Sequence, residues 1–372
     1  MKIMIAAGGT GGHINPGLAI ARGIQAAHPM AEIRFVGTKR GLESTLIPRE
    51  GFGLSFIDVR GFRRRLSWDT AVTFLTLLRS FFQAGRLLRE WKPDLVIGTG
   101  GYVCGPILSV AVLRGIPTLL HESNALPGVT TKLLAPFVSR VAVSFEDAAG
   151  RLSKQARVRV TGNPVRQSLM AVDKEAARAR CGLGKNDLFV VAFFGSLGSD
   201  TLNRMLIEML RAHPEGLGYR LLFGTGLKHH GKVMAAMEGQ VPPGVEILPY
   251  LYEVDDVLAA ADLAVCRAGA MTPGELCVLG VPSILIPSPF VADNHQEYNA
   301  RSLESRGASV VVLEKYLTGA LLHEQIRTLL DDRDLRRRMS AAALKLARRD
   351  AGRDIQEMVD DLLRLRRGGL FQ

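Results

Sequence analysis

Residues 2–27 read KIMIAAGGTGGHINPGLAIARGIQAA and contain the pattern that decides the fold. The stretch begins with a short apolar run, residues 2–7, and continues through a glycine-rich turn, residues 8–12. A helix-like segment from Pro16 to Ala27 follows. A strand, a glycine turn and a helix in this order are the repeating unit of a parallel β-sheet, so the pattern predicts an α/β fold.

The same pattern returns three times along the chain. Residues 93–102 read PDLVIGTGGY, residues 188–200 read LFVVAFFGSLGSD, and residues 261–270 read ADLAVCRAGA, each followed by an apolar or helix-prone segment. Further strand candidates are residues 32–36, 118–121, 141–143, 220–223, 245–248 and 283–286. Alternation of this kind through both halves predicts two Rossmann-like domains, each with a doubly wound parallel sheet.

A domain boundary is predicted at Thr161-Gly162-Asn163-Pro164, because a complete first set of units precedes it and a charged, helix-prone segment follows. The predicted domains are therefore residues 1–162 and 163–345. The C-terminal 40 residues are helical in composition, with a helix-prone stretch from Arg333 to Arg349 that breaks at Gly352 before a last helix to Arg367. Residues 346–372 are expected to supply the C-terminal helix that packs back on the N-terminal domain.

Composition predicts a packed globular protein with an anionic partner. The 372 residues are 47% hydrophobic and 22% charged, with a net charge of +11, which favours phosphorylated substrates, an anionic lipid surface or nucleic acid. The four cysteines have neither a CxxC pair nor metal-ligand spacing, as expected of reduced thiols. Because the chain shows no signal peptide and no apolar run of about 18 residues, we expect a cytoplasmic protein that is able to attach to a membrane surface.

Three glycine loops at strand ends predict phosphate binding: residues 8–12, 98–101 and 195–198. Glycines allow close backbone approach to a ligand, and the following helix offers N–H groups and a positive dipole end. No lysine completes a P-loop after the first of them, and no acidic residue ends the next strand as in dinucleotide sites. A dinucleotide-dependent oxidoreductase is therefore disfavoured.

Residues 262–301 contain the most specific pattern. A strand candidate ends at Arg267, and Pro273 stands where a helix takes its first residues. Glu275 follows in the first turn, where a carboxylate can accept two hydrogen bonds from a ribose diol or simply balance the helix dipole. Residues 293–296, DNHQ, add a polar cluster before a further helix.

Seven motifs resemble, in order, those of the MurG glycosyltransferases. They are GGTGGH (8–13), GTGGY (98–102), HESN (121–124), GNPVR (162–166), a Gly-Ser-x-Gly loop (195–198), CRAGAMTPGE (266–275) and DNHQEYNA (293–300). The resemblance spans the chain and implies the two-domain GT-B architecture. It also implies transfer of N-acetylglucosamine, with inversion, from UDP-N-acetylglucosamine to undecaprenyl-pyrophosphoryl-N-acetylmuramoyl-pentapeptide, the lipid-linked precursor of peptidoglycan.

The resemblance further implies which residues bind the substrates. Phosphates would be contacted by Thr10, Gly11 and Gly12 in the first loop and, for the UDP diphosphate, by Arg166 and Ser196. The donor sugar would be contacted by Asn124 and Gln296, and the uracil by Leu251. The uridine site would be lined by Ala270, Met271, Thr272, Pro273, Gly274 and Glu275, with Glu275 on the ribose. The third loop departs from the family pattern at Phe194 and Leu197.

Inverting transfer requires a base for the incoming hydroxyl. His13 is the first candidate, because it ends the first glycine loop and histidine titrates near neutral pH. The helix start disfavours an imidazolium, so His13 is alternatively a hydrogen-bond donor or a plain packing residue, and Glu122 is the second candidate base. No cofactor or metal is expected, because the one Asp-x-Asp, Asp332-Arg333-Asp334, resembles a helix N-cap.

Residues 60–92, RGFRRRLSWDTAVTFLTLLRSFFQAGRLLREWK, combine basic and apolar side chains. Part of the apolar set must cover a sheet, but the excess favours a segment that dips into an anionic surface. We therefore expect a peripheral protein on the cytoplasmic face of the cell membrane. Nucleic acid is disfavoured as a partner, because the chain shows no helix-turn-helix, zinc or RNP-like signature.

Two other functions remain open from the residues. One is another UDP-sugar enzyme of the same architecture, such as a diacylglycerol glycosyltransferase or a UDP-N-acetylglucosamine epimerase. The other is a membrane-bound scaffold that binds nucleotide sugars without turnover.

Overall fold

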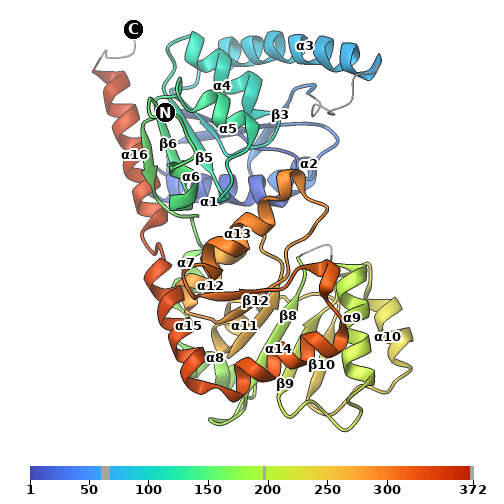
Figure 1. Cartoon of the computed structure of the whole chain (residues 1–372). Helices are drawn as coiled ribbons and strands as arrows, with labels where there is room; N and C mark the ends of the chain where they lie inside the picture. The colour runs from blue at the N-terminus through green and yellow to red at the C-terminus, as the bar shows by residue number, and fades with distance from the viewer. Residues whose placement is uncertain (60–67, 196–197, 369–372) are drawn as a thin grey trace. The chain divides into compact units, whose positions relative to one another are not determined.

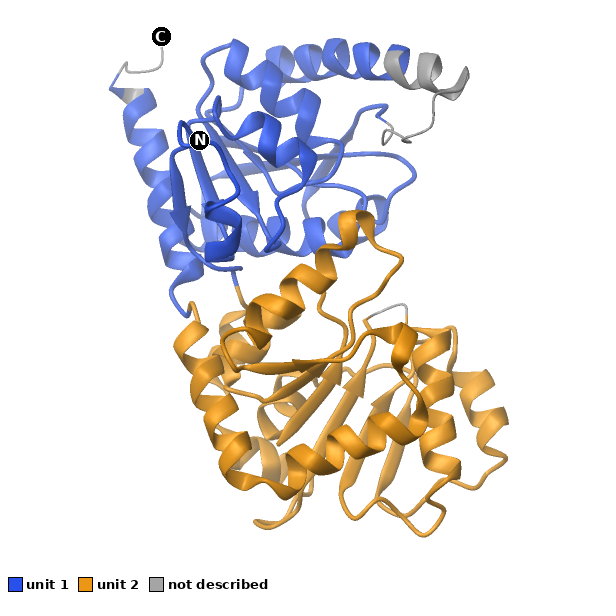
Figure 2. Ribbon diagram, in the orientation of Figure 1, with its two compact units in different colours: residues 1–164, 349–372 blue, residues 165–348 orange. Residues whose placement is uncertain are grey.

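The computed structural model describes residues 1–59, 68–195 and 198–368 (Figure 1). The chain divides into two compact units, coloured separately in Figure 2. Unit 1 comprises residues 1–164 and 349–372, and unit 2 comprises residues 165–348.

Unit 1 is built on a seven-stranded parallel sheet of order β3-β2-β1-β4-β5-β6-β7. Its strands are β1 (Lys2–Ala6), β2 (Glu32–Gly37), β3 (Gly53–Phe56), β4 (Leu95–Gly98), β5 (Thr118–Glu122), β6 (Arg140–Val143) and β7 (Val158–Val160). Its helices are α1 (Gly11–Ala27), α2 (Glu43–Arg49), α3 (Trp68–Trp91), α4 (Cys104–Leu113), α5 (Val129–Leu134), α6 (Glu146–Ala149) and α16 (Ala351–Arg367).

Alternation along β1 explains how this sheet is covered on both faces. Ile3 and Ile5 belong to a core with α1 and α16, whereas Met4 and Ala6 belong to a core with α3 and α4. Successive side chains of a strand point to opposite faces, and a central parallel strand is therefore apolar throughout. The C-terminal helix α16 completes the first of these two cores.

Unit 2 is built on a six-stranded parallel sheet of order β10-β9-β8-β11-β12-β13. Its strands are β8 (Phe189–Phe193), β9 (Arg220–Gly224), β10 (Val245–Leu248), β11 (Leu263–Cys266), β12 (Ser283–Leu285) and β13 (Ser309–Val311). Its helices are α7 (Gln167–Ala171), α8 (Lys174–Arg180), α9 (Asp200–Arg211), α10 (His230–Met237), α11 (Val254–Ala260), α12 (Thr272–Leu279), α13 (His295–Glu304), α14 (Gly319–Asp331) and α15 (Arg333–Leu346), with short 3-10 helices at Ala292–Asn294 and Glu314–Tyr316.

In both sheets the strand order reverses beside the first strand of the unit. In unit 1 the glycine loops after β1 and β4 flank this switch point, and in unit 2 the loops after β8 and β11 do so. A doubly wound sheet binds its ligand at such a point, outside the carboxyl ends of the strands. The topology thus confirms the predicted fold class and places the predicted loops beside the switch points of the two sheets.

Two predicted helix limits are wrong. Helix α1 begins at Gly11, five residues before Pro16, because the carbonyl of Thr10 accepts the amide of Ile14 at 3.1 Å and starts the helical ladder within the glycine loop. Gly352 lies inside α16 rather than at a break. The predicted N-cap at Asp332 is confirmed, since its carboxylate accepts the amide of Leu335 at 2.8 Å.

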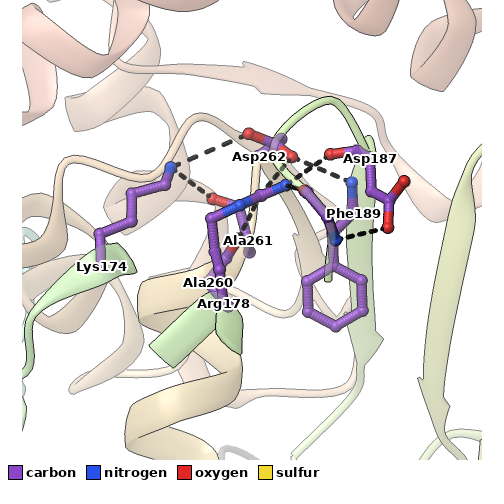
Figure 3. A network of polar contacts seen from close by, with 8 residues as sticks. Lys174, Arg178, Asp187, Phe189, Ala260, Ala261 and Asp262 are labelled. Atoms are coloured by element: carbon purple, nitrogen blue, oxygen red, sulfur yellow. Dashed lines mark hydrogen bonds and ion pairs between the residues drawn. The ribbon is translucent and has the colours of Figure 1, made fainter. Parts of the chain in front are cut away.

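A charged network lies at the opposite, amino-terminal end of the unit 2 sheet (Figure 3). Asp262, just before β11, accepts hydrogen bonds from Arg178 and from the amide of Phe189, both at 3.0 Å. Lys174 lies 3.9 Å from the same carboxylate and donates to the carbonyl of Ala261. These contacts fasten α8 to the starts of β8 and β11, so this cluster is part of the scaffold.

Candidate functional site

The first glycine loop of unit 1 ends in the start of α1. Gly9 has φ +93°, a conformation that favours glycine, and Thr10 is extended, with a side chain that does not cap the helix. Gly11 and Gly12 are the first two residues of this 17-residue helix. The amides of a helix start are suited to a phosphate, so the predicted phosphate contacts Thr10, Gly11 and Gly12 lie together at one anion-favouring point.

His13 occupies the third position of α1, and both its ring and its backbone carbonyl make hydrogen bonds with the glycine loops. Its Nδ1 donates to the carbonyl oxygen of Gly8 at 3.2 Å, and the hydroxyl of Thr10 lies 3.4 Å from the same nitrogen. Thr99 donates to the His13 carbonyl at 2.7 Å. Because a carbonyl only accepts, the neutral imidazole carries its proton on Nδ1 and its lone pair on Nε2.

The second glycine loop makes room for this ring. Gly100 and Gly101 have φ +106° and +83°. A Cβ on Gly100 would lie 2.4 Å from Cδ2 of His13, and one on Gly101 would lie 2.3 Å from the oxygen of Gly8. The GTGGY motif therefore packs closely against the first loop, and its predicted contact with phosphate stays a prediction.

Glu43, the first residue of α2, is a buried carboxylate that sequence reasoning missed. It accepts hydrogen bonds from the amide of Gly9 at 3.0 Å and from the amide and hydroxyl of Thr38 at 2.8 and 2.7 Å. Burial raises the pKa of this carboxyl, but these hydrogen bonds outweigh it and leave the pKa below its usual value. The one sequence signal was an acidic residue in the glycine-containing turn GTKRGLE.

Glu122 and Asn124 stand at the carboxyl end of β5, and the structure brings them together. The Glu122 carboxylate is buried and accepts from the amide and side chain of Asn124, at 3.1 and 3.2 Å. It also accepts from the amide of Gly128 at 3.0 Å and the hydroxyl of Thr131 at 2.6 Å. Four donors on one carboxylate fix the shape of the loop that carries Asn124.

The burial of His121, beside Glu122, leads us to expect that acid lowers the stability of unit 1. Complete burial lowers the pKa of its imidazole to about 4. The folded state therefore favours neutral His121. Above the unfolded pKa of about 6.5, protonation of His121 costs the folded state nothing, and as the pH drops from there towards 4 the free energy of unfolding falls, because only the unfolded chain binds the proton. We expect His121 to reduce the free energy of unfolding by about 2 kcal/mol between pH 7.5 and pH 5.

The measurement is urea unfolding followed by tryptophan fluorescence, because both tryptophans, Trp68 and Trp91, belong to unit 1. His121→Gln should show a shallower pH dependence than the wild type. Equal slopes for the two proteins would contradict the prediction.

In unit 2, Arg166 connects two acidic residues. Its guanidinium lies 2.8 Å from Asp255 and 3.6 Å from Glu275, whose side chain is 16% exposed. Burial raises the pKa of Glu275, Arg166 opposes this rise and Asp255 adds to it. The two residues predicted to bind the diphosphate and the ribose thus lie side by side, which the sequence did not indicate, and Asp255 was missed.

The remaining predicted residues of unit 2 lie at the carboxyl ends of its strands. Leu251 is buried against Gly224, where a Cβ would lie 3.0 Å from the leucine Cγ. Gln296, in the first turn of α13, accepts the amide of Ser288 at 2.9 Å. The predicted uridine site covers the loop before α12 and the first turn of that helix. Its residues are Ala270, Met271, Thr272, Pro273, Gly274 and Glu275.

The loop before α13 has an unusual backbone. Asp293 and Asn294 are consecutive non-glycine residues with φ +50° and +54°. Aspartate and asparagine adopt left-handed backbone more readily than other non-glycine residues, but two in succession are uncommon, and such positions cluster at binding sites. This observation supports the DNHQ cluster as a part of the site.

The third glycine loop is described only in part, because Ser196 and Leu197 lie outside the described residues. Gly198 has φ +73°, and a Cβ there would lie 2.3 Å from the carbonyl oxygen of Thr225. Ser199 caps α9 and accepts from Arg267 at 3.0 Å. Arg267, a partly buried residue of the CRAGA motif to which the sequence gave no role, pairs with Glu314 and fastens this loop to the end of β11.

Two kinds of feature were not found among the described residues. Within residues 1–59, 68–195 and 198–368, no three His, Cys, Asp or Glu side chains gather as a metal site would require. Among the same residues, no helix is long and apolar enough to cross a bilayer.

Comparison with known proteins agrees with the motifs. Residues 3–143 match the glycosyltransferase family 28 N-terminal domain, and residues 189–355 match its C-terminal domain. A relative from Acetivibrio thermocellus is 47% identical over 99% of this chain and 100% of its own length, and one from Ruminiclostridium cellulolyticum is 47% identical over 98% and 100%. Both are named UDP-N-acetylglucosamine–N-acetylmuramyl-(pentapeptide) pyrophosphoryl-undecaprenol N-acetylglucosamine transferase.

Solved structures show the same architecture. The crystal structure of Acinetobacter baumannii MurG matches 97% of this chain and 99% of its own, with a TM-score of 0.79 and 28% identity. The glycosyltransferase of kitacinnamycin matches with a TM-score of 0.71 at 18% identity, over 97% of this chain and 99% of its own, which supports the fold alone.

Proposed function

The chain belongs to the MurG family of glycosyltransferases, and on that premise we propose a role for each of its glycine-loop sites. The protein transfers N-acetylglucosamine from UDP-N-acetylglucosamine to the N-acetylmuramyl-pentapeptide carried on pyrophosphoryl-undecaprenol. The near-full-length agreement with transferases of that name is the observation that carries this activity.

Unit 2 is proposed as the donor site. Glu275 accepts hydrogen bonds from the ribose hydroxyls, and Arg166, held beside it, contacts the diphosphate together with Ser196. Leu251 packs against the uracil, and Gln296 contacts the sugar. Asn124 is the one residue of unit 1 that we propose as a further contact of the donor sugar. The proximity of Arg166 and Glu275 supports this assignment, because one nucleotide presents a diol and a diphosphate a few ångströms apart.

In unit 1, Thr10, Gly11 and Gly12 are proposed to contact phosphate, and His13 to act as the base of an inverting single displacement. Nε2 of His13 takes the proton of the acceptor hydroxyl as its oxygen forms the new bond to the anomeric carbon. The bond from that carbon to UDP breaks, and UDP leaves with the electron pair, its charge balanced by Arg166 and backbone amides. Glu122 is proposed to hold the Asn124 loop, because its oxygens already accept four hydrogen bonds.

The test is UDP release, measured with UDP-N-acetylglucosamine or UDP-glucose, with and without a short-chain lipid-linked muramyl-pentapeptide. We expect rapid release only when UDP-N-acetylglucosamine and the acceptor are both present. Release that does not depend on the acceptor would favour a hydrolase, whereas conversion of the donor to another UDP-sugar without net release of UDP would favour an epimerase. Binding of both substrates without release would favour a scaffold.

Attachment to an anionic membrane is proposed for the surface of helices α3, α4 and α5, which pack in succession in unit 1 (Figure 1). Exposed apolar side chains on and just after these helices are Leu75, Leu78, Phe82, Leu113, Val129, Leu133 and Phe137. Basic residues of the same helices and of the turn after α4 are Arg79, Arg86, Arg89, Arg114 and Lys132. Arg60, Arg63, Arg64 and Arg65 of the predicted membrane segment lie outside the described residues. We propose that this surface holds the protein peripherally on the cytoplasmic face.

Phe82 offers the sharpest test of this surface, because its side chain is 80% exposed on α3. Phe82→Glu should weaken binding to phosphatidylglycerol vesicles about tenfold or more, since it removes an inserting ring and adds charge repulsion. Vesicle co-sedimentation measures the effect. Met30→Glu, at a similarly exposed site between α1 and β2, is the matched control and should bind as the wild type does. Equal loss in both variants, or in neither, would overturn the proposed surface.

A further inference from the structure

A single peptide group joins Glu43 to His13. The amide of Gly9 donates to Oε2 of Glu43 at 3.0 Å, and the carbonyl oxygen of Gly8 accepts from Nδ1 of His13 at 3.2 Å. These two atoms belong to the same peptide unit, between Gly8 and Gly9. A carboxylate, a peptide and an imidazole therefore form one hydrogen-bonded chain.

We propose that Glu43 is a positioning residue that sets the tautomer and basicity of His13 through the Gly8–Gly9 peptide. A carboxylate on the N–H side polarises the peptide and makes its carbonyl a stronger acceptor, because hydrogen bonds in a chain reinforce one another. The stronger acceptor keeps the proton on Nδ1 and favours the imidazolium that forms when Nε2 takes a proton. The inference deepens the proposed function, since it rests on His13 as the base.

The surroundings of Glu43 fit this role. The carboxylate is fully buried, and its other oxygen is held by the amide and hydroxyl of Thr38. These hydrogen bonds keep the carboxyl pKa below its usual value, so Glu43 is charged at neutral pH. A Cβ on Gly37 or Gly41 would lie within 2.5 Å of the Glu43 side chain, so the backbone at both glycines packs directly against this carboxylate side chain.

The peptide itself is also held in place. A Cβ on Gly101 would come within 2.3 Å of the Gly8 oxygen, so the second loop packs directly on the accepting carbonyl. Cys104, at the start of α4, donates to the carbonyls of Ala6 and Gly100 and fixes the ends of both loops. The geometry of the hydrogen-bonded chain is therefore set by contacts on each side.

The other titratable groups of the neighbouring elements are of three kinds. Burial raises the pKa of the Cys104 thiol to about 12, so it stays neutral. Tyr102, Lys39 and Arg40 are exposed to solvent. Glu122 is buried at the end of β5, where its carboxylate is held by its own loop.

The experiment is Glu43→Gln in the full-length enzyme, which removes the charge and keeps the shape. We expect kcat to fall about three- to tenfold, with the donor KM unchanged. The acidic limb of the pH profile of kcat should shift to lower pH by about half a unit, because the His13 imidazolium is no longer stabilised by the charge of Glu43. A merely structural role would lower the amount of folded enzyme without moving this limb.

Thr38→Val is the matched control, because it deletes a hydrogen bond to the same carboxylate and leaves the Gly9 bond and the charge. It should lower the unfolding midpoint without moving the acidic limb. In a His13→Ala background, Glu43→Gln should have no further effect on kcat. An unmoved limb in Glu43→Gln, or an equal shift in Thr38→Val, would overturn the proposal.

Nitrogen-15 NMR of the wild-type imidazoles is a second measurement that does not depend on how the variants fold. His13, assigned by its loss in His13→Ala, should carry its neutral proton on Nδ1. A dominant Nε2–H form would overturn the inference. If His13→Ala itself kept full turnover, the proposed base would fail instead, so the two failures are distinguishable.

Discussion

His13→Ala should lower turnover by about 100- to 10,000-fold and leave the donor Kd within about a factor of two. The loss is confined to the chemical step, because the imidazole contacts its own loop and meets the acceptor hydroxyl only as the proton moves. UDP release under saturating donor and acceptor measures turnover, and calorimetric titration with UDP measures donor binding.

His28→Ala is the matched control for this prediction. His28 lies at the other end of the same helix, where it pairs with Asp360 of α16 at 2.7 Å. It should keep turnover while losing some stability. A His13→Ala enzyme with undiminished turnover would exclude His13 as the base.

The fold was accessible from the sequence because its signals are local. An apolar run such as residues 2–7 followed by glycines implies a buried parallel strand and a loop at its carboxyl end. Helix ends were harder to place. Gly11 and Gly12 resemble a turn by propensity, yet the Thr10 carbonyl accepts the Ile14 amide and starts α1 there. Tertiary packing on β1 and β4 outweighs propensity at this point.

The site was only partly accessible from the sequence, because its contacts join distant segments. The motifs indicated Arg166 and Glu275 separately, but their proximity depends on how the segment before α7 meets the start of α12. Glu43 and Asp255 carry no motif, and their roles follow from the partners that folding gives them. A pattern within one stretch of sequence does not predict contacts with distant segments.

Glu275→Ala should raise the Kd of UDP about 100-fold. Hydrogen bonds to a charged group contribute about 1.5–3 kcal/mol each, and a tenfold change in affinity corresponds to about 1.4 kcal/mol. The partly buried carboxylate also lies 3.6 Å from Arg166, so its loss leaves that guanidinium with Asp255 alone. Because the pKa of Glu275 is raised, wild-type affinity should weaken as the pH falls through that pKa, and the variant should not show this dependence.

Titration with 2′,3′-dideoxy-UDP separates the ribose contact from a general loss of structure. The wild type should bind this analogue about as weakly as Glu275→Ala binds UDP, whereas the variant should hardly distinguish the two ligands, because the deleted carboxylate and the deleted hydroxyls are the same interaction. Asp256→Ala, which removes a carboxylate of α11 paired with Arg180, should bind UDP as the wild type does. If Glu275→Ala still preferred UDP over the dideoxy analogue by the wild-type factor, the ribose would be recognised elsewhere, and Glu275 would serve only the start of its helix.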